Sequence, residues 1–221
     1  MIRFYAAIAI GVAISTIAGS AQAEAVASTD LDTLARGGTI VGPVGPTVNA
    51  SILSERGEAV ADIVGQVDCP AGIDPCQPAE APEGTVYTFI YRVTPGADST
   101  NDAPFQPNAP VTMADGVTLF GLNFIPPGFT GVAGYSFSDV AAALDGRAEE
   151  ANGLMSIDVD EAAGRMVWAT DAEQGWDRGE TITFFFQTTQ PPKGPGEGFL
   201  LEAGSVSGSG HGPVPRAIEP E

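Results

Sequence analysis

Short runs of β-branched and aromatic residues alternate with glycine and proline along the chain, and this punctuation constrains the fold more than any other feature. The 221 residues include 28 glycines and 18 prolines, which typically end strands and occupy turns. Helical periodicity is nearly absent. The pattern predicts an all-β fold, an antiparallel β-sandwich of the jelly-roll or immunoglobulin-like kind, with at most one or two short helices.

The predicted strand with the clearest pattern covers residues 85–94. Tyr87, Phe89 and Tyr91 alternate onto one of its faces. Because an aromatic face is stabilised by burial, we expect this face to point into the core. Further strands are predicted at 116–125, at 180–189, and in a hairpin formed by 154–160 and 165–170.

The sequence divides into four predicted parts. They are a signal peptide at 1–23, a polar segment at 24–38 with a short helix over 30–35, a β-sandwich domain at 39–204, and a disordered Gly/Ser/Pro tail at 205–221. The first part has one arginine, an apolar run and a small-x-small ending. This pattern predicts cleavage after Ala23 and export to the periplasm or the medium. No later segment is apolar enough to predict a membrane span.

Acidic residues outnumber basic residues by 28 to 9, which gives a formal net charge of −19. Binding to a phosphate backbone requires basic patches that release counterions. The charge balance therefore predicts that neither nucleic acid nor an anionic membrane surface is a partner.

The only histidine, His211, and the only lysine, Lys193, follow the last strong predicted strand. The predicted folded body thus lacks both residue types. Histidine-dependent triads, histidine-ligated metals and lysine Schiff bases are excluded from that body. The chain is predicted not to be an enzyme, and no catalytic residue is assigned.

Cys69 and Cys76 are the only cysteines, and they lie at the two ends of a loop that contains proline and glycine. Exported proteins keep such pairs oxidised. Two cysteines without a nearby histidine do not complete a usual structural zinc site. The pair therefore predicts a disulfide that closes the loop.

Carboxylates are the plentiful titratable groups, and they cluster at predicted turns. Asp158, Asp160 and Glu161 form a partial cage of hard oxygen ligands, which makes calcium the one cofactor that the sequence suggests. A second group, at positions 171, 173 and 177, surrounds a tryptophan. The same acids leave open a carboxylate-pair glycoside hydrolase.

Aromatic residues near predicted loops are the candidates for ligand contact. A glycan-binding module presents such rings on a rigid exposed face. Trp176 and Tyr135 are the two residues predicted to contact a ligand in this way. A glycan or a second copy of the chain is the partner that this interpretation allows.

Residues 159–192 contain several short motifs, and their order can be compared with that in known proteins. A turn that ends at Gly164 is followed by Val-Trp-Ala-Thr-Asp at 167–171, by Arg-Gly-Glu at 178–180, and by Ile-Thr-Phe-Phe-Phe at 182–186. This order resembles secreted bacterial β-sandwich proteins of the exosortase-sorted (PEP-CTERM-like) and variable-anchor surface families. The resemblance implies an acidic β domain with a surface-associated, non-enzymatic role. The chain ends without the apolar helix and basic cluster of those families, so free secretion or periplasmic residence is expected instead of anchoring.

These observations predict an exported, non-catalytic β-sandwich protein with a binding or structural role at the cell envelope or in the extracellular matrix. The alternative is a carbohydrate-active domain, either a glycan-binding module or a carboxylate-pair glycoside hydrolase.

Overall fold

The computed structural model describes residues 23–40, 47–103, 105, 109–112, 114–144, 150–170 and 175–217. The predicted signal peptide lies outside the described residues, except for Ala23. Thirteen strands make up the fold, together with helix α1 (Phe137–Ala143) and two 3₁₀ turns, η1 (Leu31–Thr33) and η2 (Ala151–Gly153). The strands are β1 (Glu24–Ala25), β2 (Ser28–Asp30), β3 (Arg36–Thr39), β4 (Thr47–Leu53), β5 (Ala59–Pro70), β6 (Tyr87–Pro95), β7 (Val117–Leu122), β8 (Phe129–Tyr135), β9 (Met155–Asp160), β10 (Arg165–Thr170), β11 (Ile182–Thr188), β12 (Pro192–Ala203) and β13 (Val206–Pro215).

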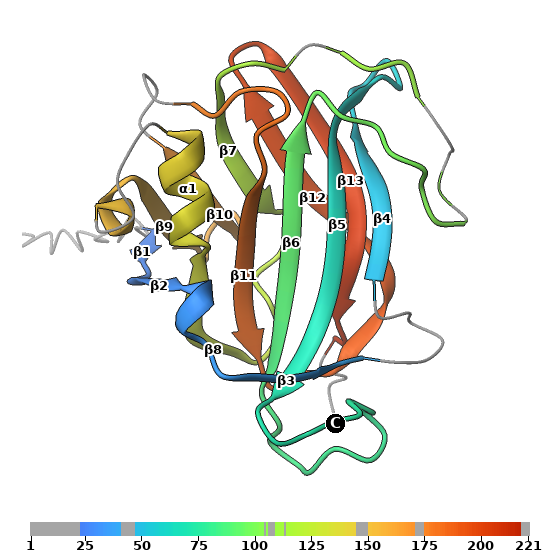
Figure 1. The fold of residues 1–221 in the computed structure, drawn as a ribbon, viewed down its shortest axis with the longest axis vertical. Helices are drawn as coiled ribbons and strands as arrows, with labels where there is room; N and C mark the ends of the chain where they lie inside the picture. Colours follow the sequence, from blue (N-terminus) through green and yellow to red (C-terminus); the bar gives the residue numbers. More distant parts are fainter. Residues whose placement is uncertain are drawn as a thin grey trace, which may run out of the picture.

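All thirteen strands belong to one hydrogen-bonded sheet, and twelve of them follow the order β1-β9-β10-β7-β12-β13-β4-β5-β6-β11-β8-β2, with β3 paired to β5 beside this path. The sheet curls, so that β5, β6 and β11 lie in front of β7, β12 and β13 in Figure 1. The prediction of an all-β chain with few helices is confirmed. The strands form a single curled sheet, where the prediction was a sandwich of two sheets.

Aromatic side chains fill the space between the facing halves of the sheet. Tyr91 of β6 lies 4.9 Å from Phe199 of β12, and Phe120 of β7 lies 4.7 Å from Phe184 of β11, measured between ring centroids. All four side chains are buried. The predicted inward face of the 85–94 strand is confirmed, because Tyr87, Phe89 and Tyr91 all belong to the core.

The predicted disorder of residues 205–221 is wrong for the described part of that segment. Strand β13 pairs along its whole length with β12 and contacts β4 on its other side. Composition suggested disorder because glycine and serine bury little apolar surface. Here the backbone supplies the hydrogen bonds, and the missing side chains make room for bulky neighbours. A Cβ atom at Gly210 would lie 2.9 Å from Ile52 Cγ1. Residues 218–221 lie outside the described part.

Residues 24–40, here called the N-terminal strap, join the two ends of the sheet path. Strand β1 pairs antiparallel with β9, and β2 pairs in parallel with β8. The strap then crosses the front of the sheet and reaches β5 through β3, as Figure 1 shows. The short helix expected over 30–35 shrinks to the η1 turn, where the Asp30 carboxylate accepts a hydrogen bond from the amide of Asp32. The flanking residues extend because they pair with β8 and β5.

Apolar contacts hold the middle of the strap to the outer face of the sheet. Leu31 is buried there against Ile90 of β6 and Phe185 of β11, with Leu34 and Val132 packed at the margin. This small cluster is separate from the main core. Among the helices in the described part of the chain, none is long and apolar enough to cross a membrane.

Candidate functional site

A network of polar side chains fastens the strap where β3 crosses the outer face of β5. Because side chains alternate along β5, Val67 and Cys69 point into the core while Gln66 and Asp68 point outward, under the strap. Thr39 lies opposite Asp68 in the register of β3 and β5. The carboxylate of Asp68 is therefore covered by the strap, and the residue is only 3% exposed.

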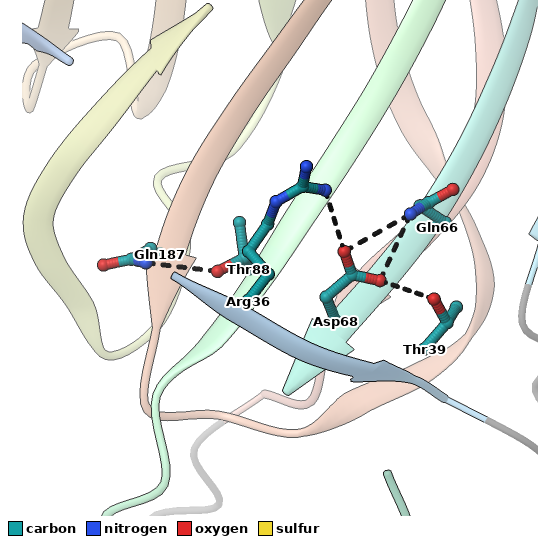
Figure 2. A network of polar contacts seen from close by, with 6 residues as sticks. All are labelled: Arg36, Thr39, Gln66, Asp68, Thr88 and Gln187. Carbon is teal, nitrogen blue, oxygen red and sulfur yellow. Dashed lines mark hydrogen bonds and ion pairs between the residues drawn. The ribbon is translucent and has the colours of Figure 1, made fainter. Parts of the chain in front are cut away.

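Asp68 accepts hydrogen bonds from three side chains, which Figure 2 shows converging on one carboxylate. The guanidinium Nη1 of Arg36 donates to Oδ2 at 3.0 Å. Oδ1 accepts from Thr39 Oγ1 at 2.8 Å and from Gln66 Nε2 at 3.1 Å. A buried carboxylate is tolerated only when it is paired and hydrogen-bonded. We call Arg36, Thr39, Gln66 and Asp68 the strap network.

The strap network continues into a polar row across three strands. Asp68 lies opposite Thr88 of β6, and Thr88 lies opposite Gln187 of β11. Gln187 Nε2 donates to Thr88 Oγ1 at 3.1 Å (Figure 2). Asp68 accepts hydrogen bonds within the strap network and Thr88 accepts one from Gln187, so the geometry of the row favours a structural role.

The second buried carboxylate, Asp62, fastens a loop in the same manner. Its two oxygens accept from the backbone amide of Ser99 at 2.8 and 2.9 Å, and Oδ2 also accepts from the Ser99 hydroxyl. Beside it, Ser51 Oγ donates to Asp98 at 2.6 Å. A general base needs an acceptor within reach of a substrate proton. These two carboxylates instead accept from groups of the protein.

A pocket of about 440 Å³, here called the seam pocket, opens where the strap passes from β9 to β8. The strands diverge at this point, because β1 follows β9 while β2 follows β8. The lining residues are Glu24, Ala25, Val26, Ala27, Ile125, Phe129, Thr130, Gly131, Val159 and Glu161. The pocket has one aliphatic and aromatic wall, formed by Val26, Ile125, Phe129 and Val159, and two carboxylates, Glu24 and Glu161.

Another pocket, of about 340 Å³, lies between the β4–β5 turn and the β12–β13 turn. Its lining is mostly polar and includes Ser54, Glu55, Arg56, Glu58, Thr112, Ser205 and Ser207. No aromatic ring is among the residues that line it in the described part of the chain.

The acids predicted to bind calcium do not gather into a site. Asp158 accepts from Ser156 Oγ at 3.1 Å on the outer face of β9. Asp160 accepts from the amide of Ala163 at 2.9 Å and lies 3.8 Å from Arg165 Nε. Across the described ranges, no three His, Cys, Asp or Glu side chains are placed to hold a metal ion, and Glu161 adds no third ligand. Positions 171 and 173 of the second acidic group lie outside these ranges.

The two residues predicted to contact a ligand are both in the core, so that prediction is wrong. Trp176 and Tyr135 are 0% exposed. Trp176 joins the sheet through a bridge to Val117 and packs against Phe184, at 5.8 Å between ring centroids. The Tyr135 hydroxyl donates to the carbonyl of Ala151 at 2.8 Å, and desolvation by burial raises its pKa.

The predicted disulfide is confirmed between Cys69 and Cys76, with an S–S distance of 2.02 Å and both residues buried. The closed loop anchors the end of the strap. Ile40 forms a parallel bridge with Cys76, and the amide of Gly38 donates to the carbonyl of Ile73 at 2.9 Å. The disulfide and the strap network therefore fix the same end of the strap.

His211 and Lys193 are part of the folded body, which corrects the expectation that both lie beyond it. Lys193 is in β12 and His211 is in β13. His211 Nε2 lies 3.4 Å from Glu197 Oε1, and its ring packs on Phe105 at 5.1 Å between centroids. The histidine thus connects β12, β13 and the loop that follows β6.

Comparison with models of protein families, with curated proteins and with solved structures finds no significant match to this chain. The candidate sites therefore rest on their own geometry. Sequence reasoning missed the strap network. Gln66 and Asp68, two polar residues that alternate with apolar ones on β5, were its signal in the sequence.

Proposed function

We propose that the chain is an exported, non-catalytic protein with a binding or structural role at the cell envelope or in the extracellular matrix. The observation that carries this proposal is the anchoring of the strap by an oxidised loop. Disulfides persist in oxidising compartments and are rare in the cytosol. Because the Cys69–Cys76 loop contacts Gly38 and Ile40, the strap attains its full stability only where the pair stays oxidised. The leader-like sequence at 1–23 supports the same location.

The buried carboxylates and the two tryptophans contact other parts of the protein, which supports a role without catalysis. The buried carboxylates Asp62 and Asp68 hold a loop and the strap. Trp168 and Trp176 are core residues. The resemblance of residues 159–192 to exosortase-sorted surface proteins favours the same role. The arrangement supplies a rigid β scaffold whose surface is acidic.

Cell fractionation tests the location and the role together. In the producing cells, we expect the protein to have the mature size, to carry an oxidised pair, and to sediment with the envelope or the extracellular polymer. An Ala23→Asp variant should keep its leader, because a charged residue blocks a small-x-small cleavage site. Ala27→Asp, at an exposed position of the strap, is the matched control and should be processed normally.

Two results would overturn the proposal. One is a reduced protein that resides in the cytoplasm. The other is release of reducing ends from envelope or matrix polysaccharide by the purified protein, which would favour the carbohydrate-active alternative.

A further inference from the structure

We propose that the seam pocket binds a small amphipathic cation, a molecule with an apolar body and one amine or quaternary ammonium group. This inference goes beyond the proposed function, which assigns no ligand. It rests on the lining of the pocket, on the charge at its rim, and on the shape of the strand edge beside it.

One wall of the pocket is apolar and continuous with the core. Val26, Ile125 and Phe129 are partly buried and pack against the core cluster, and Val159 belongs to it. Ligand pockets of proteins are typically about 300–1,000 Å³ and mostly apolar. A volume of about 440 Å³ is therefore sufficient for the apolar body of a small ligand.

The rim of the pocket carries a net negative charge, because its two carboxylates outweigh the one α-amino group that cleavage after Ala23 would leave on Glu24. Glu24 and Glu161 are exposed and lie on the two segments that border the opening, strand β1 and the β9–β10 turn. None of the described residues that line the pocket is basic. The nearby Arg165 lies 3.8 Å from Asp160, on the strand after the turn. An apolar wall with two carboxylates at the opening complements a ligand that has an apolar body and a positive group.

The edge of β8 disfavours an added peptide strand at the same place. Gly131 has φ of 83°, and the register of β8 with β11 shifts beside it, between Phe186 and Thr188. Such a bulge interrupts the row of backbone groups that a new strand would need. Strand β2 already occupies the regular part of β8, from Ala133 to Tyr135. A small molecule therefore fits the pocket better than an extended peptide.

Calorimetric titration of the exported protein with three probes that carry a matched eight-carbon chain tests the proposal. Octyltrimethylammonium should bind with one-to-one stoichiometry, octanol should bind more weakly, and octanoate should bind at least about tenfold more weakly than the cation because the rim repels it. Equal affinity for octyltrimethylammonium and octanoate, or no binding of the cation, overturns the proposal.

Variants locate the binding. Ala27→Trp places a large ring in the pocket from an exposed position and should abolish binding. If that variant fails to fold, Thr130→Trp makes the same test from the opposite wall. Glu24→Gln and Glu161→Gln should each weaken cation binding about two- to fivefold and leave octanol binding unchanged.

Glu202→Gln is the matched control, because Glu202 is an exposed acid on β12 that does not line the pocket. It should leave the affinity for octyltrimethylammonium unchanged. An equal loss of affinity in Glu202→Gln and Glu161→Gln would show that the cation responds only to the overall charge of −19, and would overturn the proposed site.

Discussion

Strand β13 and the N-terminal strap are both poor in large apolar residues, yet the fold incorporates them by opposite means. Strand β13 lies within the sheet path, with β12 on one side and β4 on the other. Its backbone makes the hydrogen bonds, and its glycines let Ile52 and Phe199 pack against it. The strap lies across the outside and is held by side chains, through Leu31 in a small apolar cluster and Arg36 on Asp68.

The difference shows that a segment without large side chains can still be a central strand. What such a strand requires is empty space at the positions where its neighbours are bulky. A segment on the outside of the sheet instead requires large side chains of its own, because only these reach the sheet. The two regions should therefore respond to different substitutions.

The largest effect is expected at Gly210 of β13. A valine there would bring Cβ to 2.9 Å from Ile52 Cγ1 and to 3.2 Å from the carbonyl oxygen of Ser51. Overpacking of this kind costs about 1–3 kcal/mol or more, and the nearby backbone gives little room for relaxation. We expect Gly210→Val to lose about 3 kcal/mol of unfolding free energy, measured by urea denaturation.

Gly194 of β12 is the matched control, since a Cβ atom there meets nothing within 4 Å. Gly194→Val should change stability by less than about 0.5 kcal/mol. If Gly210→Val were no worse than this control, β13 would not be packed as a central strand.

The disulfide is expected to have the next largest effect, and it acts on the strap. Cys69→Ala with Cys76→Ala opens a loop with a sequence separation of 7. The chain-entropy relation assigns such a loop about 2–3 kcal/mol. Proteolysis should also cut the strap faster, because Gly38 and Ile40 contact the loop. The measurement combines urea denaturation with limited proteolysis and mass spectrometry.

Reduced wild-type protein is the control for the cysteine pair and should match the double variant in both assays. Faster cleavage in β13 with an intact strap would contradict the assignment of the disulfide to the strap.

Loss of the ion pair in the strap network should have a smaller effect. Arg36→Met keeps the apolar stem but leaves the Asp68 carboxylate with only the neutral donors Thr39 and Gln66. Because Arg36 is about one third exposed, we expect a loss of about 1–2 kcal/mol rather than the full cost of an unpaired buried charge.

Two further variants separate this pair from general charge effects. Arg92→Met removes the same charge from an exposed position on β6 and should cost less than about 0.5 kcal/mol. Combining Arg36→Met with Asp68→Asn should recover part of the loss, because no buried charge remains. A double variant that is strictly additive would argue against coupling between the two side chains.

The comparison also shows which parts of the fold the sequence could predict. The alternation of aromatic residues correctly predicted the buried face of β6, where Tyr87, Phe89 and Tyr91 point inward. The expectation that an exported chain keeps its cysteines oxidised correctly predicted the disulfide. Both rest on residues close together in the chain. The all-β class follows from the same local patterns.

Features that depend on distant pairing were missed. Arg36 and Asp68 are 32 residues apart, and nothing local indicates that β3 pairs with β5. Residues 205–221 were predicted to be disordered because they carry few large apolar side chains. That criterion takes no account of the space that small residues leave for bulky neighbours. Trp176 was predicted to contact a ligand because it lies near a predicted loop, although a bridge to Val117 places it in the core. The seam pocket likewise exists only because β1 and β2 pair with opposite ends of the sheet path.

Alkaline pH should give the smallest effect, and it acts on the attachment of β13. The Tyr91 hydroxyl donates to the carbonyl of Pro213 at 2.7 Å, and desolvation by burial raises the pKa of Tyr91 well above its usual range. Since the folded pKa exceeds the unfolded pKa of about 10, this contribution to stability is fully present below about pH 10. It is lost as pH rises through the folded pKa. At about pH 10.5 the loss should be about 1 kcal/mol.

Tyr91→Phe isolates the contribution of the Tyr91 hydroxyl to stability, because the variant lacks both the ionisable group and its hydrogen bond to Pro213. At neutral pH the wild type should be more stable by about 1 kcal/mol, and at about pH 10.5 that advantage should nearly vanish. Urea denaturation at the two pH values measures the difference, and tyrosinate absorbance reports when the ring ionises. An advantage that stays constant between the two pH values would mean that Tyr91 ionises as readily in the folded protein as in the unfolded chain. In that case the contact between β6 and β13 would be open to water, and β13 would resemble the strap more than a central strand.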